Sequence, residues 1–206
     1  MIEVSGVVVG RRSGEAIAER LAAARTARLS YGHVGSTIDR VAPPGFTSLE
    51  VHIVVRGTVP AARRALRGWA AHAGIGATIA PVSPPEEGST VLVVASLGPF
   101  EVVAPDRVVA VVDEADRCAF AYATLEGHPE EGEERFEAEV VGAGRVRLTV
   151  RAHSRPADRL GGALGPLVRR LQRAAAERYL AAWAEAIAAD RTHGPPDAGP
   201  AAGPAS

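Results

Sequence analysis

The chain of 206 residues contains no lysine, so its 23 basic residues are all arginine. The arginines are spread along the chain and are balanced by 24 acidic residues, which leaves a formal net charge of −1. Proteins that bind nucleic acid carry a basic surplus on one face, so this composition argues against a nucleic-acid partner. Together with abundant alanine, glycine and proline, the exclusive use of arginine is typical of a GC-rich bacterial genome.

Cysteine and long apolar runs are also scarce. Cys118 is the only cysteine, so no disulfide can form within the chain, as is usual in a reducing compartment. No apolar run reaches membrane-spanning length, and the N-terminus lacks the pattern of a signal peptide. We therefore expect a cytoplasmic protein without a membrane span. Because 47% of the residues are hydrophobic, the chain is able to bury a sizeable core.

Hydrophobic periodicity predicts an α+β fold. Helices are expected at residues 15–25 and 60–73 and from residue 156 onward, the last one loosened by glycines and a proline at 161–166. Strands are expected at residues 2–9, 48–56, 77–81, 90–96, 100–104, 107–113, 118–125, 134–141 and 145–153. Short strands joined by turns predict an antiparallel meander. We divide the chain into an N-terminal strand-helix extension (1–28), a main domain (29–190) and a disordered tail (191–206).

The stretch FAYATLEGHPEEGEERF, residues 120–136, organises this meander. Side chains alternate along a strand, so one face of the sheet is aromatic and apolar and needs a cover, which the long C-terminal helix supplies. We expect a pocket for a small apolar molecule between this face and the helix. Its predicted ligand-binding residues are Phe120, Tyr122, Thr124, Phe136, Arg107 and Trp183. On the opposite face, Glu137 and Glu139 are expected to meet Arg147 and Arg151 in solvent.

Residues suited to proton transfer lie in and around the acidic connection. His128 and Glu133 are able to act as an acid–base pair, because neighbouring carboxylates raise one another's pKa, and Tyr122 supplies a hydroxyl. The alternative is a row of hydrated surface carboxylates. No third ligand accompanies His128 and Glu133, so no metal is expected. Residues 10–14 lack the lysine of a phosphate loop, and the glycines at 142–144 lie between two strands, so no cofactor is expected either.

Several segments resemble a known family. The stretch at 120–136, followed by a strand and by SRP at 154–156, resembles an uncharacterised family, the domain of unknown function numbered nineteen-ninety. The segments YxxVGxT at 31–37, PPGF at 43–46 and LGP at 97–99 resemble it as well, and the likeness covers residues 29–179. The order of elements is similar to the helix-grip fold of START-like and birch-pollen-allergen-like proteins. The resemblance implies a curved antiparallel sheet wrapped around the C-terminal helix, and it implies no activity.

Three functions are compatible with these patterns. The first is the binding of a small apolar or lipid-like molecule in the predicted pocket. The second is an enzyme of cyclase, dehydratase or hydrolase type on the same scaffold, with Tyr122, His128 and Glu133 as catalytic candidates. The third is an interaction protein whose core is filled. The sequence indicates neither an oligomeric state nor the identity of a ligand.

Overall fold

A computed structural model describes residues 3–4, 7–9, 12–97, 99–157 and 165–193 of the chain. The strands are β1 (Glu3–Val4), β2 (Val7–Val9), β3 (Thr47–Arg56), β4 (Thr78–Ala80), β5 (Thr90–Leu97), β6 (Phe100–Asp113), β7 (Arg117–Thr124), β8 (Glu130–Gly142) and β9 (Arg145–Pro156). The helices are α1 (Gly14–Thr26), α2 (Ser36–Asp39), α3 (Val59–Arg67), α4 (Ala70–Ala73) and α6 (Gly165–His193).

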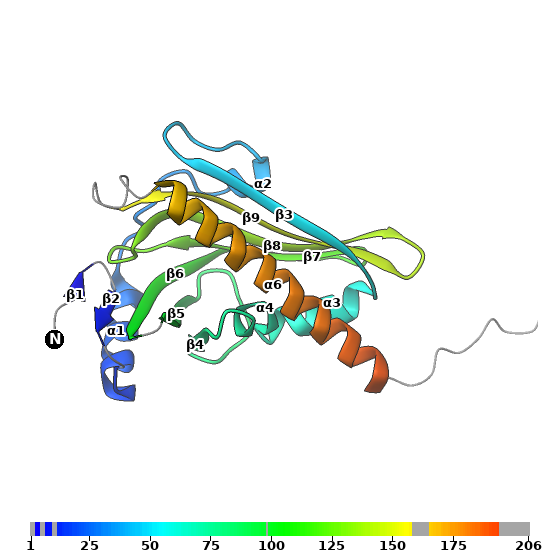
Figure 1. The fold of residues 1–206 in the computed structure, drawn as a ribbon, viewed down its shortest axis with the longest axis horizontal. Coiled ribbons are helices and arrows are strands. Elements are labelled where there is room, and N and C mark those ends of the chain that lie inside the picture. The colour runs from blue at the N-terminus through cyan, green and yellow to red at the C-terminus, as the bar shows by residue number, and fades with distance from the viewer. Residues whose placement is uncertain (1–2, 5–6, 10–11, 98, 158–164, 194–206) are drawn as a thin grey trace, which may run out of the picture.

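Within the described part of the chain, nine strands form one sheet, in which β1, β2, β6, β7, β8, β9 and β3 follow one another and β5 and β4 branch from β6. All pairings are antiparallel. Helix α6 crosses one face of the sheet diagonally (Figure 1). The predicted α+β architecture, a curved antiparallel sheet that holds a long C-terminal helix, is therefore confirmed. None of the helices among the described residues is long and apolar enough to cross a membrane.

Several elements differ from the expected boundaries. Strand β8 begins at Glu130 and not at 134, and Pro156, where the last helix was expected to begin, is the last residue of β9. The helix predicted over 60–73 ends at Arg67, and Trp69 has a left-handed backbone (φ 59°) that separates α3 from α4. The indole of Trp69 donates to the carbonyl oxygen of Ser83 at 2.6 Å, which holds the side chain against the sheet. The strands predicted at 100–104 and 107–113 are one strand, β6, because the chain stays extended through Pro105. The glycines and proline predicted to loosen the last helix fall partly at 161–164, and these positions, like 194–206, lie outside the described residues.

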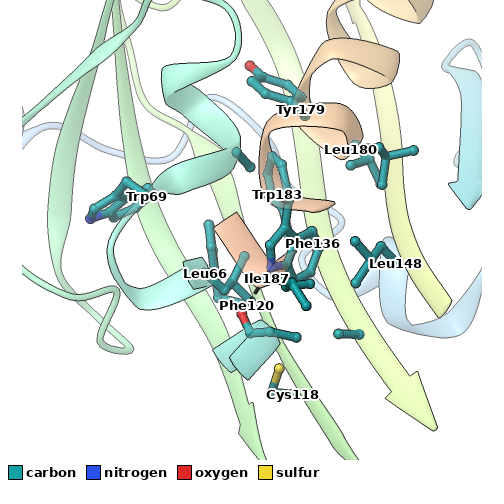
Figure 2. Packing of buried hydrophobic residues seen from close by; sticks show 14 of the residues in the cluster. Leu66, Trp69, Cys118, Phe120, Phe136, Leu148, Tyr179, Leu180, Trp183 and Ile187 are labelled. Atoms are coloured by element: carbon teal, nitrogen blue, oxygen red, sulfur yellow. Dashed lines mark hydrogen bonds between the residues drawn. The ribbon is translucent and has the colours of Figure 1, made fainter. Parts of the chain in front are cut away.

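The main core lies between the sheet and helices α3, α4 and α6. Figure 2 shows Phe120, Phe136 and Trp183 in one cluster with Leu66 and Ile187. These side chains are at most 4% exposed, and the Trp183 indole donates to the Ala62 carbonyl oxygen at 3.0 Å. Burying an aromatic side chain stabilises the fold by about 1.5–3 kcal/mol, so this cluster fixes the middle and end of α6 on the sheet.

The other face of the sheet is also partly buried. Ala24 of α1 packs with Leu92, Val103 and Leu125, which point away from the main core. The N-terminal helix thus covers one end of the outer face.

The charged outer face is not the solvent face that the sequence predicts. Glu137 and Arg151 are only 6% and 3% exposed. Glu137 pairs with Arg135 at 2.6 Å, and Arg151 pairs with Glu50 at 2.7 Å. Arg151 also donates to the carbonyl oxygen of Thr37 in α2, at 2.9 Å. The reason is that the segment carrying α2 lies over β8 and β9 and excludes water from them.

One expected pair on this face is present. Glu139 and Arg147 meet across the β8–β9 hairpin at 2.7 Å and remain partly exposed. Exposed pairs of this kind stabilise a fold by about 0–1 kcal/mol, so the pair contributes little to stability.

Candidate functional site

A cavity of about 190 Å³ lies between the sheet and the first half of the described part of α6. Its floor comes from β6, β7 and β8, and α6 contributes Gln172, Ala175 and Tyr179. Four of its lining residues are acidic. The carboxyl groups of Asp106, Glu130 and Glu134 lie on the cavity side, whereas that of Glu133 lies on the opposite face of the sheet. We call it the acid cavity.

Strand register brings the acids together. Tyr122 of β7 lies opposite Glu134 of β8, and Thr124 lies opposite Asp106 of β6. Directly opposed residues share a face of the sheet, and residues two apart on one strand share it as well. Asp106, Tyr122, Thr124 and Glu134 therefore all point toward α6 and into the cavity.

The side chains of Tyr122 and Glu134 are joined by a hydrogen bond. The Tyr122 hydroxyl donates to Oε2 of Glu134 at 2.5 Å, and Nε2 of His72 lies 3.3 Å from the same hydroxyl. Burial raises the pKa of Glu134 to about 7, although the hydrogen bond from Tyr122 opposes the shift. Burial also raises the pKa of Tyr122 well above its usual value and lowers that of His72 to about 3. A carboxyl group that titrates near neutral pH is suited to accept or donate a proton.

Asp106 is the most deeply buried of the three acids. It is 1% exposed, and its Oδ1 has no hydrogen-bond partner. The nearest cationic candidate is Nε2 of His128, at 3.7 Å from Oδ1, which is too long for a hydrogen bond. Burial, and then the charges of Glu134 and Glu130, raise the pKa of Asp106 well above its usual range.

Glu130 is held in place by α6. The Gln172 amide nitrogen donates to both carboxyl oxygens of Glu130 at 2.9 Å and to the Ser154 hydroxyl at 3.0 Å. Burial raises the pKa of Glu130, against the effect of these hydrogen bonds. The side-chain amide of Gln172 thus ties α6 to both β8 and β9 at the edge of the cavity.

Four of the predicted site residues border the acid cavity, namely Tyr122, Thr124, His128 and Glu133. Thr124 Oγ1 accepts from the Gly132 amide at 2.9 Å and lies 2.7 Å from the Ser30 hydroxyl oxygen. His128 is largely buried, with 14% of its side chain exposed, and burial lowers its pKa to about 4. His128 is therefore neutral at physiological pH.

Glu133 has its carboxylate on the opposite face of the sheet. It accepts from the backbone amides of Gly35 and Thr37, at 2.7 and 3.1 Å, and from the Thr37 hydroxyl. The expected grouping of Glu133 with Tyr122 does not occur, because β8 begins at Glu130 and the acids alternate between faces from there. The neighbouring Glu134 is the residue that meets Tyr122. Phe136 was expected on the inner face, so counting back two residues identifies Glu134 from sequence alone.

The remaining predicted ligand-binding residues lie elsewhere. Phe120, Phe136 and Trp183 belong to the closed core, farther along α6. Arg107 is on the outer face, where it donates to the carbonyl oxygens of Ala24 and Arg25 at 3.2 and 3.1 Å. It binds the C-terminal end of α1, whose carbonyl groups attract a cation.

An apolar hollow of about 340 Å³ adjoins the acid cavity. The two share Val93, Ala104, His128 and Glu130. The other lining residues of the hollow are Ile75, Ala95, Val102, Pro129 and Pro156. The polar groups are thus gathered on one side of the shared wall and the apolar groups on the other.

The described residues contain no group of three or more histidine, cysteine, aspartate or glutamate side chains that is arranged to hold a metal ion.

Comparison with known proteins gives a family and a fold. The family model described as "Domain of unknown function (DUF1990)" matches residues 30–182. A protein of Deinococcus radiodurans described as "UPF0548 protein" is 42% identical over 74 residues, which span 36% of this chain and 37% of that relative. The matched part of the chain thus corresponds to little more than a third of that relative's length.

Solved structures share the fold at low identity. A START superfamily protein from Mycobacterium smegmatis superposes with a TM-score of 0.50 at 14% identity, over 70% of this chain and 99% of that one. The ZhuI aromatase/cyclase from a Streptomyces species superposes with a TM-score of 0.51 at 14% identity, over 72% and 96%. These neighbours have the START-like, helix-grip fold, and at such identity they support the fold alone.

Proposed function

This chain belongs to the DUF1990 family, and we propose that it binds a small molecule in the acid cavity and the adjoining apolar hollow. One observation carries the proposal. A cavity of about 190 Å³ with convergent polar groups opens beside an apolar hollow, between a sheet and the helix that it holds. A mostly apolar site with a few placed polar groups is the usual form of a small-molecule site.

The proposed ligand is smaller and more polar than a lipid. The cavity is below the roughly 300–1,000 Å³ that drug-sized ligands occupy. The aromatic side chains Phe120, Phe136 and Trp183 pack against one another, so they leave no wall for a long apolar chain. An apolar part of the ligand fits the hollow beside Val93 and Ala104 instead.

Native mass spectrometry of the protein purified from its expression host tests this proposal. We expect a discrete extra mass that denaturation releases. Ala175 lines the cavity, so Ala175→Phe fills it and should abolish the extra mass. Ala174→Phe places the same side chain on the exposed face of α6 and is the matched control. An extra mass that survives Ala175→Phe, or the absence of any extra mass from the unmodified protein, would contradict the proposal.

An enzyme that transfers protons is the second candidate. It is favoured by the contact between Tyr122 and Glu134, whose pKa lies at about 7. If the bound molecule is a substrate, incubation with the protein converts it, and Glu134→Gln abolishes conversion while the molecule still binds. Equal conversion rates for the two proteins would remove Glu134 from the reaction.

A further inference from the structure

We propose that the ligand of the acid cavity is an organic cation, a protonated amine carried on a compact apolar body. This inference rests on the proposed function and adds the chemical class of the ligand. It assigns the ammonium group to the space between Asp106 and Glu134 and the apolar body to the hollow beside Ala104.

The described lining of the acid cavity contains acidic side chains and no positive charge to balance them. Asp106, Glu130 and Glu134 all border the cavity, and no arginine is found among the described residues that line it. His72 and His128 contact this group of side chains, and burial lowers the pKa of each well below neutrality, so neither supplies a positive charge. Three carboxyl groups thus share a buried space without a counter-ion, so they are either neutralised by protonation or paired with a bound cation.

One carboxyl oxygen of Asp106 is buried and lacks a hydrogen-bond donor among the described residues. Asp106 is 1% exposed, lines the cavity, and has an Oδ1 atom without a hydrogen-bond partner. Leaving a buried acceptor unsatisfied costs about 1–3 kcal/mol, so a ligand that donates to Oδ1 recovers that free energy.

Two strong donors of the lining are already engaged. The Tyr122 hydroxyl donates to Glu134, and the Gln172 amide donates to Glu130 and Ser154. Once Asp106 and Glu134 are ionised, the cavity offers a ligand mainly acceptors. An ammonium group has three donors and no acceptor, which matches this lining, whereas a carboxylate ligand brings further acceptors and a repelling charge.

Aromatic and apolar side chains of the lining also suit a cation with an apolar body. The rings of Tyr122 and Tyr179 border the cavity, and aromatic faces attract cations. The hollow that shares Ala104 with the cavity is lined by aliphatic and proline side chains, with His128 and Glu130 at the shared wall. A ligand that is cationic at one end and apolar at the other fits both spaces.

Calorimetric titration with benzylamine, benzyl alcohol and benzoate at neutral pH tests the inference. The three probes share a ring and differ in charge. We expect the protonated amine to bind at least about tenfold more tightly than the alcohol, a difference equivalent to about 1.4 kcal/mol, and benzoate to bind most weakly. Asp106→Asn should remove the preference for the amine. Asp113→Asn, which alters an exposed acid on the same strand, controls for net charge and should keep it.

The outcomes separate the ligand class from the binding function. Equal affinity for amine and alcohol, or tighter binding of benzoate, would overturn the cationic class and leave the small-molecule site standing. A preference for the amine that persists in both Asp106→Asn and Glu134→Gln would overturn the assignment of these acids. If no probe binds while native mass spectrometry finds a bound molecule, the cationic class of the ligand is wrong and the proposed small-molecule binding stands. If neither experiment detects binding, both proposals fail.

Discussion

Burial, opposed by the hydrogen bond from Tyr122, sets the pKa of Glu134 in the acid cavity. The hydroxyl group stabilises the ionised form of Glu134, yet burial outweighs it and brings the pKa to about 7. The native protein therefore holds a proton on Glu134 at pH values where the unfolded chain, with an ordinary glutamate pKa, has lost it.

This difference predicts how Glu134→Gln changes stability with pH. A raised native pKa contributes stability that is complete below pH 4.5 and is lost as pH rises toward about 7. Glutamine does not titrate, so Glu134→Gln does not lose this stability. Between pH 4.5 and about 7 the free energy of unfolding of the variant should therefore rise relative to that of the unmodified protein, by at most about 1.4 kcal/mol per pH unit. Urea unfolding at several pH values measures the difference. Glu126→Gln, an exposed acid, should show no such trend, and a flat difference for Glu134→Gln would contradict the assignment.

The same residues show what the sequence predicts at this scale. The alternation around Phe120 and Phe136 correctly placed Tyr122 on the inner face, and the same rule places Glu134 beside it. Glu133 was wrongly predicted to lie beside Tyr122, because the acidic stretch was expected to be a loop, and side chains do not alternate between two faces in a loop. Asp106 was missed because it falls between the strands expected at 100–104 and 107–113, which the structure joins into the single strand β6.

At the scale of elements, the approach of α4 to α6 depends on one glycine. A Cβ atom on Gly74 would lie 2.5 Å from the carbonyl oxygen of Arg178 and 2.7 Å from Cβ of Ala182. Both atoms belong to α6, so the two helices pack with backbone against backbone at this point. Tyr179, which borders the cavity, is the next residue along α6.

We therefore expect Gly74→Ala to destabilise the protein by about 1–3 kcal/mol, because the methyl group forces α4 and α6 apart. The shift should also weaken ligand binding through Tyr179. Denaturant unfolding measures the first effect and calorimetric titration the second. Gly14→Ala is the control, since a Cβ atom there meets no atom within 4 Å. Equal stability of the two variants would show that the helices tolerate the extra volume.

Periodicity predicts most elements but not where they break. The strand over residues 48–56 was predicted within one residue, since its apolar and polar residues alternate throughout. The helix over 60–73 was predicted without its break at Trp69, because the turn depends on the tertiary contact of the indole with Ser83. The start of β8 at Glu130 was missed for a similar reason, since its pairing with Pro156 of β9 is set by the sheet.

At the scale of the whole molecule, α6 serves two purposes along its length. Its later residues, including Trp183 and Ile187, pack in the closed aromatic core (Figure 2). Its earlier residues, Gln172, Ala175 and Tyr179, cover the acid cavity. The core fixes the later part of the helix on the sheet, and the earlier part covers the cavity, with Tyr179 belonging to both.

The order of helices and strands was predictable because local patterns and the family resemblance agree on it. The position of the cavity was not, because it depends on which inner-facing side chains fill the space under α6. The bulky residues Phe120, Phe136 and Trp183 were expected to enclose a ligand, and instead they fill the space themselves.

Mapping of backbone amide shifts by NMR, during titration with benzylamine and separately with benzyl alcohol, tests the central claim most directly. We predict that the shifts gather around Asp106, Gly132 and Ala175, which line the acid cavity, with both probes. The amides of Trp183 and of Ala24, in the core and on the outer face, should change little. Shifts centred on the Trp183 end of α6, or on the outer face around Ala24, would contradict a binding site in the acid cavity.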